Sequence, residues 1–246
     1  QILLQEALGF ERPLYAHLPL ILGEDRTKLS KRHGDFSVTR FREAGYLPEA
    51  LSNFLALLGW NPGTEEEIFP LSALCKEFSF GRVQKSGAVF TIKRLDWING
   101  FYLRQKSPST LAELCIPFLE QANLVKKTQE GIIVTETNET LPKETLEKIV
   151  VLYQERLKKL SEIGEFADFF FKNRVAYTPD MLSWKGTDKE ETRNALNMLE
   201  EIISGISEQD WTKEKLENVI MPEAEKQKNK QSLSADRGVV LWPLRM

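Results

Sequence analysis

Residues 28–34 read Lys-Leu-Ser-Lys-Arg-His-Gly, a short basic segment that follows an apolar run over 18–23 and precedes a predicted helix. Two lysines stand three positions apart, with a hydroxyl between them and a glycine at the exit. Such a loop places mobile ammonium groups beside backbone N–H donors, and its natural ligand is a phosphate chain. Taken alone, the string is weak evidence, because most five-residue basic strings are solvated surface loops.

Helical signals follow the loop. Ser37 can cap a helix over 38–44, and Pro48 opens a second helix that ends before Gly59. Ser72 can cap a third helix. The segment directly after the basic loop is therefore expected to be helical.

The least regular stretch covers residues 80–89. We interpret it as a loop that carries Arg82 and Lys85 toward a ligand, and a plain connector is an equally weighted alternative. Thr91 then introduces a helix with apolar residues at helical spacing.

A boundary is expected at 107–109, where Ser-Pro-Ser is typical of a turn. Thr110 with Glu113 has the pattern of a capping box at the start of the next helix. The longest periodic segment runs from Pro142 to about Ile163 and predicts one core helix of a bundle.

A second boundary is expected near 173–179. Thr187 and Glu190 form another capping-box pattern before a helix that Gly205 ends. The second half of the chain is therefore expected to be all-α.

Evidence for strands is confined to 18–22 and 132–135. Phe166 and the run 169–171 form an aromatic cluster that resembles a base-stacking platform. We favour the interpretation that these phenylalanines pack in the core.

Composition limits the function classes. The formal net charge of −3 and the pI near 5.7 argue against a nonspecific nucleic-acid binder, since such domains are usually strongly basic. A protein that reads one folded RNA can instead keep its cations in local patches. Four cations outside the loop are predicted to bind RNA: Arg82, Lys85, Arg94 and Arg104.

The two cysteines, Cys75 and Cys115, are forty positions apart, without a C-x-x-C pattern or a nearby histidine. We expect no metal site and two buried free thiols. No apolar run approaches the roughly 20 residues of a membrane span, so a cytoplasmic chain is expected.

The basic loop resembles the K-M-S-K-S signature of class I aminoacyl-tRNA synthetases, here as Lys-Leu-Ser-Lys-Arg. Further blocks that look like bacterial-type glutamyl-tRNA synthetase follow one another in that family's order: 13–22, 37–46, 47–60, 90–104 and 241–245. Four or more matching blocks are far more specific than any one of them. Between about 110 and 235 the resemblance is only to a general helical pattern.

The resemblance implies a mainly α fold at the end of a class I, Rossmann-type catalytic domain. It implies four segments: residues 1–36 for the end of the catalytic domain with its signature loop, 37–107 for a helical stem-contact domain, and 108–175 and 176–246 for two parts of an all-α anticodon-binding bundle. Glutaminyl-tRNA synthetases would instead show the alternating strands of β-barrels after the loop.

The family's second signature, H-x-G-H, does not fit this sequence, because the only histidines, His17 and His33, are sixteen positions apart. The chain is therefore expected to be a C-terminal portion that begins just before the loop and is inactive by itself.

The implied activity is that of a glutamate–tRNA ligase. Glutamate reacts with ATP, accompanied by Mg²⁺, to give glutamyl-adenylate, and the glutamyl group then passes to tRNA(Glu). By resemblance, Lys31 and Lys28 are catalytic, and these lysines with Leu29, Ser30 and Arg32 bind ATP. The expected partners are tRNA(Glu), glutamate and ATP, for a monomeric protein with no membrane association.

Two alternatives remain. The chain is a stand-alone helical RNA-binding module, or it is a helical scaffold for protein partners whose charged faces are merely solvated. An exposed apolar patch without a basic stripe would favour the scaffold.

Overall fold

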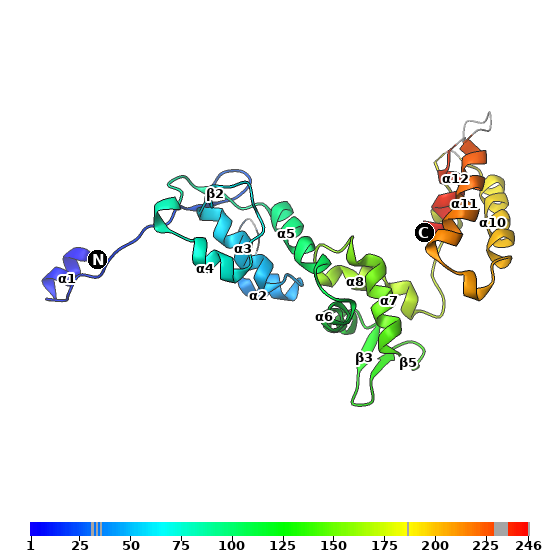
Figure 1. Cartoon of the computed structure of the whole chain (residues 1–246), viewed down its shortest axis with the longest axis horizontal. Coiled ribbons are helices and arrows are strands. Elements are labelled where there is room, and N and C mark those ends of the chain that lie inside the picture. Colours follow the sequence, from blue (N-terminus) through cyan, green and yellow to red (C-terminus); the bar gives the residue numbers. More distant parts are fainter. Residues whose placement is uncertain (31, 33, 35, 186, 229–235, 246) are drawn as a thin grey trace. The chain divides into compact units, whose positions relative to one another are not determined.

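The computed structural model of the chain describes residues 1–30, 32, 34, 36–185, 187–228 and 236–245. The chain forms two compact units, Gln1–Asn173 and Arg174–Met246, and helices dominate both (Figure 1). The mainly helical fold is thus confirmed. Within the described residues, no helix has the length and apolar character needed to cross a membrane.

The described residues of the first unit form helices, 3-10 turns and five short strands. The α-helices are α1 (Ile2–Ala7), α2 (Val38–Glu43), α3 (Pro48–Gly59), α4 (Leu71–Glu77), α5 (Ile92–Arg104), α6 (Pro108–Gln121), α7 (Lys143–Gln154) and α8 (Ile163–Phe166). The 3-10 turns are η2 (Phe80–Arg82), η3 (Leu160–Glu162) and η4 (Asp168–Phe171). The strands are β1 (Ile21–Leu22), β2 (Ala88–Val89), β3 (Val125–Lys127), β4 (Ile132–Val134) and β5 (Thr140–Leu141).

The second unit is entirely helical within its described residues. Its elements are α9 (Pro179–Leu182), α10 (Lys189–Ser204), η5 (Glu208–Asp210), α11 (Lys213–Lys228) and α12 (Gly238–Arg245). A small apolar core joins three of these helices through Leu199, Ala224 and Val240.

Several predicted helix boundaries are confirmed. The Ser37 hydroxyl accepts a hydrogen bond from the Arg40 N–H and so caps α2. Pro48 is the first residue of α3, and α3 includes Gly59, one residue beyond its expected end. Thr91 occupies the N-cap of α5. Ser37 acts through its side-chain hydroxyl, and Pro48 through the fixed φ of its ring.

Two predicted caps are wrong. Helix α4 begins at Leu71 after Pro70, because proline sets an extended turn and leaves Ser72 inside the first helical turn. Helix α6 is capped by Ser107, whose hydroxyl accepts from the Thr110 N–H at 3.2 Å.

The predicted capping box in the second unit is displaced by one residue. Asp188, rather than Thr187, caps α10: its carboxylate accepts from the Glu191 N–H at 2.8 Å, and the Glu191 carboxylate accepts from the Asp188 N–H at 3.3 Å. Gly205 lies at the C-cap, as expected. Both residue pairs have the required spacing, so the sequence alone does not distinguish them.

The long helix expected over 142–163 is interrupted. Helix α7 ends at Gln154, and the chain leaves the helical path before η3. The backbone N–H of Leu160 donates instead to the carbonyl oxygen of Gly45, 3.1 Å away. A contact with a distant segment therefore replaces the local helical hydrogen bond.

The strands of the described residues form two small sheets. Strands β1 and β2 pair in parallel, with Ile21 opposite Ala88 and Leu22 opposite Val89, so the stretch 80–89 is not merely a loop. Strands β3, β4 and β5 form an antiparallel sheet, of which only β4 was expected. The other strands have two or three residues, which is too short to show a period-two pattern.

The core of the first unit is continuous from Phe41 to Phe171. Cys115 lies fully buried in it, and burial raises the pKa of this thiol to about 12. Cys75 is exposed, so the expectation of two buried thiols is wrong for this residue. The core interpretation of the phenylalanine cluster is also wrong in part: Phe171 is buried, whereas Phe169 and Phe170 are 43% and 42% exposed.

A junction of side-chain amides and backbone groups joins α5 to the segment after α7. The fully buried amide of Asn99 accepts from the Leu47 N–H at 2.8 Å and donates to the carbonyl of Lys158 at 2.6 Å. Gln154 donates to backbone carbonyls at the end of α5, including that of Leu103 at 3.0 Å. Each contact satisfies a backbone group that would otherwise be unpaired in the interior.

Gly45 makes the closest approach at this junction. Its φ of +85° is in the left-handed region, and an added Cβ would lie 2.7 Å from the Leu160 nitrogen. Only glycine meets both requirements.

We predict that Gly45→Ala lowers the free energy of unfolding by about 3 kcal/mol, because it combines left-handed strain with overlap against backbone. Gly63→Ala is the matched control: Gly63 has a φ of +82°, but the nearest atom to an added Cβ is 3.9 Å away. This control should cost only about 1 kcal/mol. Urea unfolding followed by circular dichroism measures both. Equal losses would show that the contact with Leu160 is unimportant.

We also predict that Asn99→Leu costs about 3 kcal/mol of unfolding free energy, because it leaves a buried N–H and a buried carbonyl unpaired. Asn194→Leu tests the same substitution at an exposed asparagine on α10 and should cost less than about 0.5 kcal/mol. The same urea experiment compares them, and a tolerated Asn99→Leu would contradict the role given to the amide.

Candidate nucleotide loop and nucleic-acid surface

The predicted phosphate-binding loop begins on a short stem built from β1. Leu22 and Lys28 face each other in an isolated antiparallel bridge, and the Leu29 N–H donates to the Ile21 carbonyl at 2.9 Å. Between them, the Asp25 carboxylate accepts from the Thr27 N–H at 3.0 Å. This Asp-centred turn reverses the chain, so that the basic residues follow directly after the strand.

Strand β2 holds the other side of this stem. The Phe90 N–H donates to the Leu22 carbonyl at 2.8 Å, and the Ala88 N–H donates to the Leu20 carbonyl at 3.1 Å. A Cβ on Gly87 would lie 2.8 Å from a methyl carbon of Leu22, so glycine permits the close pairing. The loop is thus anchored by residues far from it in sequence.

The predicted ATP-binding residues divide into an anchor and exposed groups. Leu29 is half-buried and packs against the core, whereas Lys28, Ser30 and Arg32 are exposed. Lys31, the predicted principal catalytic residue, lies outside the described residues. The described loop therefore presents cations to solvent from an apolar base, an arrangement suited to a phosphate ligand.

Two of the four predicted RNA-binding cations are engaged in ion pairs. An Arg94 Nη atom lies 2.9 Å from a carboxylate oxygen of Glu67, and the Arg104 Nε atom lies 3.9 Å from Glu155. Both arginines are on α5, and the ten residues between them correspond to about 15 Å along the helix axis. These two arginines do not form one cluster.

The other two cations lie near the 3-10 turn η2. Arg82 donates to the Pro62 carbonyl at 2.7 Å, so part of its guanidinium supports the backbone. Lys85 is exposed and lines a cavity of about 400 Å³ together with His17 and Phe80. Among the described residues, Lys85 has no ion pair, and it is the predicted cation most available to an external phosphate.

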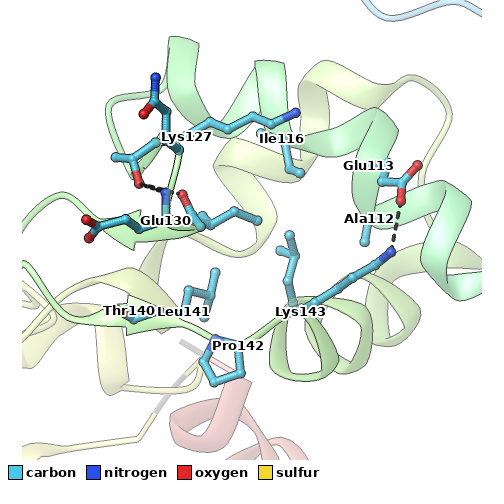
Figure 2. A pocket seen from close by; sticks show the side chains of 14 residues that line it. Ala112, Glu113, Ile116, Lys127, Glu130, Thr140, Leu141, Pro142 and Lys143 are labelled. Carbon is cyan, nitrogen blue, oxygen red and sulfur yellow. Dashed lines mark hydrogen bonds and ion pairs between the residues drawn. The ribbon is translucent and has the colours of Figure 1, made fainter.

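A further cavity was not expected from the sequence. It measures about 580 Å³ and lies between α6, the β3–β4 hairpin and the start of α7 (Figure 2). Its apolar lining includes Ile116, Leu141 and Leu146, and its charged lining includes Lys127 and Lys143. The two strands that bring Lys127 to the cavity carry too weak a sequence signal to predict this arrangement.

An ion pair lies at one side of this cavity. Lys143 points toward Glu113, and its Nζ atom is 2.9 Å from the carboxylate (Figure 2). The hydrogen bond that Lys143 donates to Glu113 lowers the pKa of the Glu113 carboxyl and raises the pKa of the Lys143 ammonium. Both groups are therefore charged at neutral pH. The apolar lining with paired charges can accommodate a planar polar ligand.

No group of three histidine, cysteine, aspartate or glutamate side chains suited to a metal ion is found in the part of the chain that the structure describes.

Comparison with protein families divides the chain in two. Residues 1–97 match the catalytic domain of class I tRNA synthetases of the E and Q type, and residues 110–246 match an anticodon-binding domain. The first match contains the loop stem with both β1 and β2. The second contains the cavity of Figure 2 and the whole second unit.

Individual relatives agree with this division. A glutamate–tRNA ligase of Carboxydothermus hydrogenoformans is 46% identical over 196 residues, which are 80% of this chain and 38% of the relative. One from Heliobacterium modesticaldum is 38% identical over 240 residues, covering 90% of this chain and 45% of the relative. A crystal structure of a glutamate–tRNA ligase from Elizabethkingia meningosepticum, in complex with its amino acid, has a TM-score of 0.67 at 29% identity and covers 99% of this chain.

The chain spans less than half the length of these relatives. The similarity nevertheless includes both family models and extends over the loop, α5 and the helices that follow. The chain therefore belongs to the class I glutamyl-tRNA synthetase family, in which it matches part of the catalytic domain and the anticodon-binding domain.

Proposed function

We propose that this chain supplies the ATP-phosphate loop and the tRNA-binding surface of a glutamate–tRNA ligase. The observation that carries the proposal is the anchored basic loop, which lies within the residues that match the catalytic domain. The chain then continues into the anticodon-binding domain. A scaffold for protein partners would have no need of an exposed cationic loop on a stem paired by β2.

In the proposed reaction, a glutamate carboxylate oxygen attacks the α-phosphorus of ATP. The bond to the bridging oxygen breaks, and pyrophosphate leaves. The 3′-terminal adenosine hydroxyl of tRNA(Glu) then attacks the activated carbonyl and releases AMP. Negative charge grows on the departing pyrophosphate, so cations that meet this charge lower the barrier.

Lys31 and Lys28 are the proposed cations for the pyrophosphate, with Arg32 as a further one. Ser30 and the backbone at Leu29 shape the loop around the nucleotide. The exposure of Lys28 and Arg32 and the anchoring of Leu29 support this division of labour. ATP would arrive with Mg²⁺, to which we assign no ligand in this chain.

Binding of tRNA is proposed to use separate segments of the chain. The proposed boundaries are 1–36 for the catalytic end, 37–107 for contact with the inner side of the tRNA, and 108–175 with 176–246 for the anticodon end. Lys85 and Lys127 have exposed ammonium groups in the two contact regions. The chain alone should not charge tRNA, because the glutamate pocket would lie in residues beyond these.

In the full-length ligase, Lys31→Ala should lower the rate of adenylate formation about 100-fold or more, because it removes a charge that acts mainly in the transition state. Lys28→Ala should have a smaller effect in the same direction. The measurements are single-turnover adenylate formation and tRNA affinity, with Lys76→Ala on α4 as an exposed control. Equal losses of activation and tRNA affinity would refute the assignment.

The chain itself should bind tRNA(Glu) more tightly than an unrelated tRNA, with an affinity that falls steeply with salt. Lys127→Met should weaken binding and reduce the salt slope by about one ion. Lys148→Met is the control: Lys148 is an exposed lysine on α7 that does not line the cavity, so its replacement should change neither the affinity nor the salt slope. Titrations by fluorescence anisotropy at several salt concentrations test this. Weak binding to every tRNA alike would count against a tRNA-binding function.

A further inference from the structure

Two phenylalanines stack on each other at the surface of the first unit. The rings of Phe169 and Phe170 have centroids 4.3 Å apart and planes 29° apart. Each side chain keeps more than two fifths of its surface exposed to solvent. The pair thus presents aromatic surface that the described fold does not cover.

The backbone beneath the pair is fixed by burial on both sides. Ala167, which precedes the 3-10 turn η4, is fully buried, and Phe171, which ends it, is 2% exposed. The Phe170 N–H donates to the Ala167 carbonyl at 3.1 Å. The rings are therefore carried by a short turn whose two ends are held in the core, so that little conformational freedom would be lost on binding.

Charged residues lie close to the pair in sequence. Lys172 forms an ion pair with Asp168, and these residues flank the two rings in sequence. The Arg156 guanidinium lies 5.2 Å from the centre of the Phe166 ring, three positions before the pair. Glu165 is also exposed nearby in sequence. Exposed aromatic faces next to a cationic side chain such as Lys172 are typical of sites for single-stranded nucleic acid.

We propose that the Phe169–Phe170 pair is a stacking platform for an unpaired nucleobase of the bound tRNA. This inference rests on the proposed tRNA-binding function and extends it to a site formed by η4. Because every base has an aromatic face, the platform would add affinity with little dependence on base identity. It would act on the RNA separately from the lysines, which contact phosphates.

The decisive variants separate aromatic stacking from simple hydrophobic contact. Phe169→Leu with Phe170→Leu keeps apolar side chains but removes both rings, whereas Phe169→Tyr with Phe170→Tyr keeps the rings. Phe10→Leu is the control, at another exposed phenylalanine, which is 64% exposed and precedes the segments proposed to contact the tRNA. Thermal unfolding by circular dichroism selects variants that fold as the unaltered chain does. The two single leucine variants replace the double variant if it does not fold.

Binding of the whole 246-residue chain to tRNA(Glu) is measured by anisotropy across salt. An anticodon stem-loop and an acceptor minihelix, each with 2-aminopurine at its unpaired positions, locate the base through quenching. The leucine variant should bind tRNA about tenfold more weakly with an unchanged salt slope, and should lose quenching in one RNA. The tyrosine and Phe10→Leu variants should bind as the unaltered chain does.

Unchanged binding by the leucine variant would overturn the platform while leaving the proposed tRNA function intact. An equal loss in the tyrosine variant would also overturn it, because the rings would then not be the cause. If the unaltered chain binds no tRNA, the proposed function itself fails, and the platform fails with it.

Discussion

The arrangement of the first unit depends on hydrogen bonds between side-chain amides and backbone groups. These backbone groups have no partner within the helices and strands. Asn99 satisfies a donor before α3 and an acceptor after α7, and Gln154 satisfies carbonyls at the end of α5. Buried backbone groups without partners are costly, so these contacts specify one relative placement of the helices rather than merely adding stability. The hairpin cavity is lined in part by α7, one of the elements that this junction connects.

The sequence predicted features that depend on a few neighbouring residues. Ser37, Pro48 and Thr91 mark helix starts because capping and proline geometry act locally. Sequence-based prediction was wrong where a contact with a residue far away in the chain determines the local structure. The helix over 142–163 is interrupted because Leu160 bonds to Gly45, and β2 exists only beside β1. Short strands paired across the fold leave almost no local signal.

The candidate site shows the same division. The basic string identified the loop, since its residue types alone indicate an anion ligand. The state of each arginine was not predictable, because Arg94 and Arg104 are paired with acids brought near by folding. Lys127 became notable only once the hairpin placed it on a cavity. The net charge of the chain is −3, and this value does not show which arginines and lysines are paired with acidic side chains. Only the folded structure shows which cations are available to a ligand.

The parallel pairing of β1 with β2 has a consequence for the order of folding. All of α2, α3 and α4 lies between Leu22 and Ala88 in the chain, so β1 and β2 meet only after a long loop closes. Closure of such a loop lowers the conformational entropy of the chain more than formation of a local helix does. Contacts between residues far apart in the sequence therefore form slowly. On a nascent chain, the basic loop would leave the ribosome well before its second strand. The phosphate-binding stem is thus a late product of folding, completed only when the helices that follow it in sequence are already in place.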